Sequence, residues 1–185
     1  MKNNFKFLAI AIFLCGFAVS SFAQVTVNSS ASATIVATIT LTKTYDLDFG
    51  NLAVTTTAGD CVLTPMAGTA PTRTPHLGVT LPAFPGTPRA GAFVVTGVSG
   101  QFYTITIPET ALTITRTTGT ETMTVTDFTT DQTVVTPGSW WGTLTGGSST
   151  FYIGGKCNVA ANQVPGLYQN LVGGAGGFPV TVNYQ

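Results

Sequence analysis

Apolar and small polar residues alternate strictly near the start of the chain. From Val25 to Leu41, odd-numbered positions carry Val, Ser, Ala, Ile or Leu, and even-numbered positions carry Thr, Asn or Ser except at Val36. Successive side chains of a β-strand point to opposite faces, so this period of two predicts a strand with one buried face. A helix would need apolar residues every three or four positions, and no stretch of the chain has that spacing convincingly.

The same alternation returns in short runs along the rest of the chain. These runs are residues 45–49, 61–63, 77–81, 93–96, 102–107, 112–117, 123–128, 151–153 and 180–184. Proline and glycine separate them, at 82–88, 97–100, 137–138, 146–147, 165–166 and 173–177. Short β-branched strands punctuated by turns predict an all-β fold, an antiparallel sandwich of two sheets. The length of 185 residues suits one domain, which we place at residues 34–185.

Residues 1–23 have the pattern of a secretory signal peptide. Two lysines accompany an apolar run over residues 7–19, and residues 21–23, Ser-Phe-Ala, form a small-x-small cleavage site. We therefore expect an exported protein whose mature chain begins at Gln24. The apolar run of about 13 residues is shorter than the roughly 20 that span a bilayer, so we expect no membrane-spanning segment after cleavage.

Charge is scarce in this chain. It has 7 Lys and Arg against 7 Asp and Glu, and charged residues make up 8% of it, compared with a usual figure of about 25%. Loss of the leader would leave five basic side chains and a net charge near −2. Binding to phosphate backbones needs clustered Lys and Arg, so we expect no nucleic-acid partner.

The sequence offers little for catalysis. Its carboxylates are scattered, and Asp46 and Asp48 alternate with apolar residues, which predicts that both point away from the core. The single histidine, His76, lacks the neighbours of a zinc site, and the chain has neither a Gly-x-Ser-x-Gly elbow nor a phosphate-binding glycine loop. We expect no enzyme activity, no metal and no cofactor.

The mature chain would keep two cysteines, Cys61 and Cys157, because Cys15 lies in the leader. An exported protein meets oxidising conditions, which favours a disulfide between them. Such a bond would close a loop of roughly 97 residues and stabilise the fold by about 4 to 5 kcal/mol on the chain-entropy model. Two unpaired thiols are the alternative.

The first alternating run is longer than a typical strand. Strands in globular domains usually have about 3 to 10 residues, whereas the alternation from Val25 to Leu41 lasts for about 17. One interpretation is a floppy N-terminus followed by an ordinary first strand. The other is that residues 24–33 are an extension that completes the sheet of a second subunit, while residues 35–41 begin the subunit's own fold.

Two adjacent tryptophans, Trp140 and Trp141, lie in a segment rich in Gly, Ser and Thr. In a strand their rings would point to opposite faces, one into the core and one outward. An exposed ring can stack on a sugar, so both residues are candidates for a glycan contact. Core packing or a contact between subunits is the alternative use of these rings.

Four segments together resemble a known family of Thr-rich secreted bacterial proteins. They are ATIVATITLTKTYDLDFGN (33–51), TMTVTDF (122–128), FYIGGKCNVAANQVPG (151–166) and FPVTVNYQ (178–185). In these segments the chain resembles the domain of unknown function 4402 family. That family in turn is similar to the spore coat protein U-like domains, which include pilins of archaic chaperone-usher pili.

The resemblance implies an immunoglobulin-like sandwich that lacks one strand. A periplasmic chaperone would fill the gap first, and the N-terminal extension of the next subunit would then replace it. By position, the resemblance implies donor side chains at Val25, Val27, Ala31 and Ala33. It also implies an acceptor groove along the C-terminal strand, at Val180, Val182 and Tyr184.

These expectations combine into one predicted function. We expect a structural subunit of a bacterial surface fibre, a fimbria or pilus, that is exported through the inner membrane and reaches the cell surface with a chaperone and an usher. Copies of the subunit would polymerise by strand complementation and serve adhesion or biofilm formation. The alternative is a monomeric secreted binding module that contacts glycans or matrix.

Overall fold

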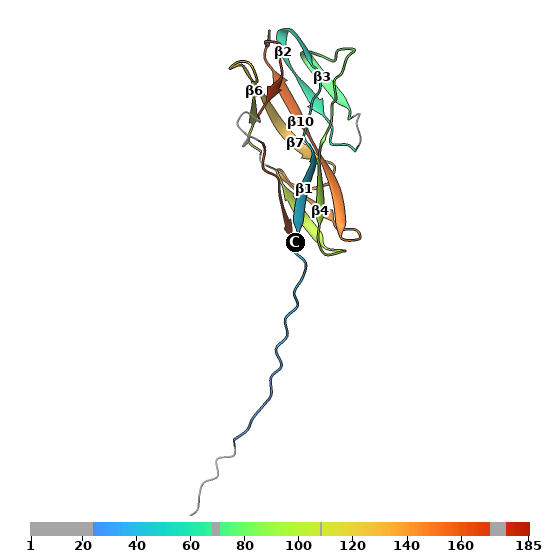
Figure 1. Ribbon diagram of the computed structural model, residues 1–185, viewed down its shortest axis with the longest axis vertical. Helices are drawn as coiled ribbons and strands as arrows, with labels where there is room; N and C mark the ends of the chain where they lie inside the picture. The colour runs from blue at the N-terminus through green and yellow to red at the C-terminus, as the bar shows by residue number, and fades with distance from the viewer. Residues whose placement is uncertain (1–23, 68–70, 108, 171–176) are drawn as a thin grey trace, which may run out of the picture. The chain divides into compact units, whose positions relative to one another are not determined.

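The structure, a computed structural model, describes residues 24–67, 71–107, 109–170 and 177–185. The expected signal peptide, residues 1–23, lies outside the described residues, as does most of the glycine-rich stretch 173–177. Residues 36–185 form one compact unit. Its described part consists of antiparallel strands in two sheets and contains no helix (Figure 1). The predicted all-β antiparallel sandwich is therefore confirmed.

Twelve strands are found in the described residues. In chain order they are β1 (Thr40–Tyr45), β2 (Ala53–Leu63), β3 (Arg73–Thr80), β4 (Gly91–Thr96), β5 (Phe102–Thr106), β6 (Leu112–Arg116), β7 (Thr122–Thr130), β8 (Thr133–Thr136), β9 (Ser139–Thr143), β10 (Ser148–Val159), β11 (Tyr168–Gln169) and β12 (Thr181–Tyr184). Strands β8, β9 and β11 were not predicted. Paired valines and paired tryptophans interrupt the period of two in β8 and β9, and β11 has only two residues.

Strand β10 is the central strand of the larger, eight-stranded sheet. Along one edge it pairs with β4 through residues 148–153 and with β2 through residues 155–159, and along the other edge it pairs with β7. Outside these, β1 pairs with β4, β3 with β2, and β6 and β11 continue the sheet beyond β7. The sheet thus has a lower half with β1 and β4 and an upper half with β2 and β3 (Figure 1).

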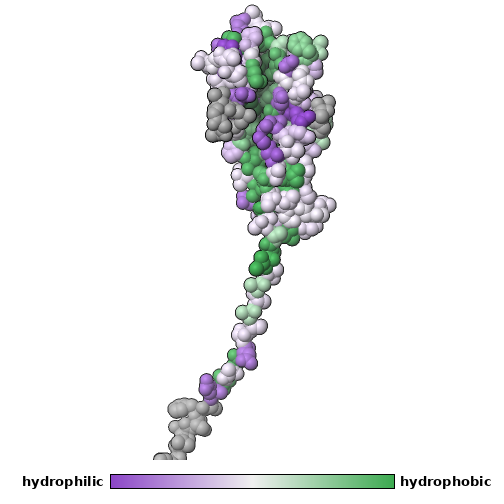
Figure 2. Space-filling model, viewed as in Figure 1, coloured by the Kyte–Doolittle hydropathy of each residue, from purple (hydrophilic) through white to green (hydrophobic). Residues whose placement is uncertain are grey.

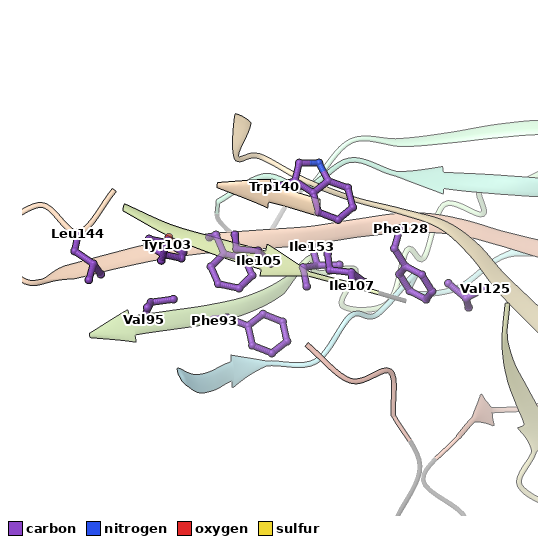
Figure 3. Close-up of a cluster of buried hydrophobic side chains, with 11 residues drawn as sticks. Phe93, Val95, Tyr103, Ile105, Ile107, Val125, Phe128, Trp140, Leu144 and Ile153 are labelled. Carbon is purple, nitrogen blue, oxygen red and sulfur yellow. The ribbon is translucent and has the colours of Figure 1, made fainter. Parts of the chain in front are cut away.

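The smaller sheet has four strands in the order β12-β5-β9-β8. Its side chains share the main core with those of β4, β7 and β10: Phe93, Val95, Tyr103, Ile105, Ile107, Val125, Phe128, Trp140, Leu144, Phe151 and Ile153. Figure 3 shows these side chains gathered between strands of the two sheets. The rings of Phe93 and Phe151, cross-strand neighbours on β4 and β10, stack with their centroids 5.4 Å apart. The small sheet therefore covers the lower half of the large one.

Strand β10 continues through two glycines where the sequence predicts a strand only for residues 151–153. Gly154 and Gly155 are buried within the strand, although glycine disfavours strand interiors. A Cβ at position 154 would lie 2.1 Å from the Leu63 carbonyl oxygen. Glycine at this position therefore allows the end of β2 to approach β10 closely.

The long alternating run divides at Thr40. Residues 24–39 form no regular secondary structure, and the side chains of Val25 and Val27 are 84% and 83% exposed. Ile39 and Leu41 are partly buried against the main core. The subunit's own first strand is thus the end of the run, slightly later than the predicted 35–41.

Candidate functional site

The upper half of the large sheet carries a second apolar cluster. Its buried members are Cys61, Val79, Cys157 and Val159, and no described residue of β5, β8, β9 or β12 belongs to it. Partly buried side chains pack against it: Phe49, Leu52, Val54, Ile114 and Met123. In a sandwich the inner face of each sheet is covered by the other sheet. The small sheet covers only the lower half here, so the upper half lacks that cover.

A groove of about 960 Å³ lies over this cluster. Its floor comes from β6, β7 and β10 and includes Ile114 and Met123. One wall is the segment between β1 and β2 with the first two residues of β2, residues 46–54, and the other is formed by residues 163–170 with the chain leading into β12. Figure 2 shows hydrophobic surface along the middle of the body, with more polar atoms on both sides. We call this feature the open groove.

Hydrogen bonds to its backbone hold the first wall of the open groove in place. The Arg73 guanidinium donates to the carbonyl oxygens of Phe49 and Asn51, at 2.8 and 3.0 Å. The Gly50 amide donates to Asp48 Oδ1 at 2.7 Å. Gly50 has a φ of 66°, which glycine adopts without a steric penalty. The wall keeps its shape, with the carboxylate of Asp48 exposed as the alternation predicts.

The opposite wall contains the Asn-Gln-x-x-Gly-x-Tyr loop, residues 162–168. The Tyr168 hydroxyl donates to the Val164 carbonyl oxygen at 2.6 Å and accepts a hydrogen bond from Gln163 Nε2 at 2.8 Å. Tyr168 also begins β11, which pairs with β6. Tyr168 thus stabilises the loop through bonds within it and attaches it to the large sheet through β11. Both walls of the open groove are therefore preformed.

Strand β11, which lines the open groove, pairs only with β6, and two further strands near the groove also have an edge that is unpaired within the described chain. Strand β1 pairs only with β4, and β12 only with β5. The end of β12 contacts the chain just before β1: the Tyr184 hydroxyl donates to the Ala37 carbonyl oxygen at 3.2 Å and accepts from the Val98 amide at 2.7 Å. Free N–H and C=O groups along such an edge can pair with a further strand.

The predicted acceptor residues lie only partly in the open groove. Val180, Val182 and Tyr184 are all partly buried against the main core, but only Val180 lines the groove. Most of the lining comes from residues that the sequence analysis did not single out, such as Leu52 and Met123. Alternation around these positions indicates a buried face. It does not indicate how far the second sheet extends over that face.

The predicted donor residues carry no strand structure. Val25, Val27, Ala31 and Ala33 lie in the irregular stretch 24–39, and their side chains are exposed. Within the described residues, this alternating segment therefore belongs to no sheet. Donation of this segment to a second chain stays a prediction.

The structure brings Cys61 and Cys157 together. They occupy directly opposed positions on β2 and β10, both are buried, and both thiols are free. Burial raises the pKa of Cys157 to about 12, with smaller contributions from Cys61 and Asp60. Burial also raises the pKa of Cys61, although the Arg73 charge opposes this. The predicted disulfide is not tested by this arrangement and stays a prediction.

The two tryptophans point to opposite faces of β9, as strand geometry predicts. Trp140 is 5% exposed and belongs to the main core, whereas Trp141 is 38% exposed. The Trp141 ring lies beside the exposed ring of Phe102, with 5.7 Å between the centroids. Of the two candidates for a glycan contact, only Trp141 is therefore accessible to a ligand.

Other titratable side chains pair on the surface of the large sheet. His76 Nδ1 lies 2.8 Å from Asp60 Oδ1, and Lys156 pairs with Asp127. Among the residues that the structure describes, no three His, Cys, Asp or Glu side chains gather where a metal ion could bind. In the same part of the chain, no helix has the length and apolar character needed to cross a membrane.

Comparison with known proteins identifies a family. The family described as "Domain of unknown function (DUF4402)" matches residues 39–184. The matched range runs from just before β1 to the end of β12 and leaves out residues 24–38. No curated protein and no solved structure matches the chain.

Proposed function

The chain belongs to the DUF4402 family, and from its fold and its open groove we propose that it is a secreted structural subunit of a bacterial surface fibre that assembles by strand complementation. The observation that carries the proposal is the upper half of the large sheet, whose apolar inner face lies beneath a groove of about 960 Å³. An uncovered apolar face of this kind favours aggregation unless a partner occupies it.

The occupant that we propose is residues 25–33 of a second copy. As a strand, nine residues span about 30 Å, and their odd-numbered side chains would lie on one face. Four of these five side chains, at Val25, Val27, Ala31 and Ala33, are apolar, the fifth is Ser29, and all five are exposed. Burial of these side chains in the groove would stabilise the contact by about 25 cal/mol per Å² of apolar surface. The inserted strand would also pair with the free edge of β12 or β1.

This contact would be heterologous, because the extension of one subunit meets the groove of the next. Heterologous contacts that do not close into a ring propagate into filaments. A fibre, with a role in adhesion or biofilm formation, is therefore the assembly that we propose. We propose the same route as that implied by the expected resemblance of the family to spore coat protein U-like domains and archaic chaperone-usher pilins. On that route a chaperone covers the groove during transit and an usher delivers the subunit to the cell surface.

Deletion of the extension tests the proposal. We expect the mature chain, residues 24–185, to form a ladder of oligomers in native gels and light scattering, and a chain that begins at Thr34 to remain monomeric. A peptide of residues 24–36 should bind the shortened chain and raise its melting temperature, while a peptide of the same composition in scrambled order should not. Oligomers of unchanged size after the deletion would contradict strand donation.

A second candidate function is supported by the exposed pair of Phe102 and Trp141 on the outer face of the small sheet. Aromatic rings exposed on a flat sheet face can stack on sugars. The chain would then be a monomeric secreted module that contacts glycans. A glycan array tests this: binding that survives both Trp141→Ala and Phe102→Ala would exclude these rings.

A further inference from the structure

The outer face of the large sheet has a second hollow, which adjoins the open groove at Tyr45. Its volume is about 330 Å³, and its lining comes from β1, β4, β10 and the residues just before β4: Thr44, Tyr45, Arg89, Ala90, Ala92, Val94, Thr150 and Tyr152. Phe93 of β4 points into the main core, so its neighbours Ala92 and Val94 point outward. The hollow therefore lies on the face opposite to the core.

Strand register places two tyrosines on either side of an alanine floor. Tyr45 of β1 is opposite Ala92 of β4, and Ala92 is opposite Tyr152 of β10. Neighbouring strands lie about 4.8 Å apart, so the two tyrosines start about 10 Å apart. Ala92 is only 3% exposed although it points outward, which means that the surrounding side chains rise above it. The result is a trench with aromatic sides.

Arg89 supplies a positive charge at one side of this trench. Its guanidinium carbon lies 4.0 Å from the centroid of the Tyr45 ring, and its backbone is fixed by two hydrogen bonds of 2.8 Å with Asp48. No carboxylate of the described residues forms an ion pair with it. Nearby Asp46 pairs with Lys43, and the Asp48 carboxylate accepts from the Gly50 amide. The Arg89 charge is thus oriented and unneutralised.

We propose that this trench binds an acidic sugar unit of a polysaccharide. Tyrosine rings pack against the C–H faces of a pyranose ring, and the hollow of about 330 Å³ that they line has the size of a small-ligand site. A guanidinium binds a carboxylate with two parallel hydrogen bonds. Tyr45, Tyr152 and Arg89 together therefore select a hexuronic acid over a neutral hexose. Tyr45 also lines the open groove, whereas Arg89, Ala92 and Tyr152 line only the trench.

Calorimetric titration of the mature chain with hexagalacturonate tests the proposal. We expect binding at least about tenfold tighter than that of a neutral galactohexaose, and weaker binding at high salt. Arg89→Gln should weaken hexagalacturonate binding about tenfold or more. Ala92→Leu, which fills the trench and leaves Arg89 in place, should abolish it. Lys156→Gln is the matched control: it removes one positive charge outside the trench and should leave the affinity unchanged.

A hexaglutamate peptide separates the saccharide from charge alone. Hexaglutamate carries carboxylates without pyranose rings, so binding as tight as that of hexagalacturonate would overturn the assignment to a sugar. Absence of hexagalacturonate binding to the mature chain would overturn the site itself, as would equal weakening by Arg89→Gln and Lys156→Gln. Each variant is first shown to melt cooperatively. If Arg89→Gln fails to fold, Arg89→Lys is used in its place. It keeps the charge but loses the bidentate geometry, and we expect the same weakening of hexagalacturonate binding.

Discussion

The side chains of Cys61 and Cys157 meet beneath the open groove, on opposed positions of β2 and β10. Opposed residues on antiparallel strands have Cα atoms about 4.5 to 5.5 Å apart, which is within the span of a disulfide. As thiols they are neutral and apolar, since burial raises the pKa of both. Either form of the pair fits the floor of the groove, but only the disulfide would tie the two strands together.

We predict that the mature chain from an oxidising compartment contains this disulfide and that reduction makes its stability depend on pH. The pKa of Cys157 is about 12 in the folded reduced chain against 9.0 for an ordinary thiol. Between these values the unfolded chain loses a proton that the folded chain keeps. Stability is thus fully present below about pH 9 and falls as the pH rises towards 12. Urea unfolding between about pH 7 and about pH 10.5, with and without reductant, measures this.

The difference in stability between oxidised and reduced chains should therefore widen above about pH 9. Other groups that titrate in this range contribute equally to both forms and cancel in the difference. A chain with both Cys61→Ala and Cys157→Ala is the control, because reductant should not affect it. Two reactive thiols in the unreduced, unfolded protein would contradict the prediction.

At the scale of elements, β10 determines how the two halves of the large sheet join. It pairs with β4 in the lower half, with β2 in the upper half and with β7 across both. Its two glycines lie where it passes from β4 to β2. Gly154 faces the Leu63 carbonyl oxygen too closely for a side chain, whereas a Cβ at Gly155 would meet nothing nearer than 3.3 Å, at Thr126.

We predict that Gly154→Ala destabilises the fold more than Gly155→Ala does. The added methyl at 154 would lie 2.1 Å from the Leu63 carbonyl oxygen and 2.7 Å from the Pro65 nitrogen, both backbone atoms. Such overpacking costs about 1 to 3 kcal/mol. The neighbouring substitution adds the same methyl to the same strand and therefore controls for strand propensity. Free energies of unfolding in urea compare the two, and equal losses would show that the close approach of β2 to β10 is not needed.

The sequence predicts the strands well where Thr and apolar residues alternate, because period two has a direct geometric cause. It fails at 133–143, where Val134-Val135 and Trp140-Trp141 break the period, and at Gly154-Gly155, where the demand for glycine comes from another strand. The open groove could not be predicted residue by residue. Alternation identifies a buried face, but only the pairing of β5, β8, β9 and β12 determines how much of that face is covered.

At the scale of the whole molecule, the chain combines a sandwich that leaves part of its inner face uncovered with an exposed stretch of alternating residues outside its sheets. Neither feature alone implies assembly. Under the proposed function they are complementary, since the apolar side chains of the stretch would cover the apolar floor of the groove. The two faces of the stretch then have different roles: odd-numbered side chains enter the groove of the next subunit, and even-numbered ones face water.

We predict that this difference is measurable one residue at a time. Val27→Asp should prevent oligomers of the mature chain from forming, because a buried unpaired carboxylate would cost several kcal/mol in the groove. Asn28→Asp introduces the same charge one position later, on the opposite face, and should leave the oligomers intact. The same contrast should hold between Val25→Asp and Thr26→Asp. Light scattering at several concentrations measures it. A floppy N-terminus without a strand role would make both faces equally tolerant, and two faces equally sensitive to charge would indicate electrostatic repulsion between subunits in place of an inserted strand.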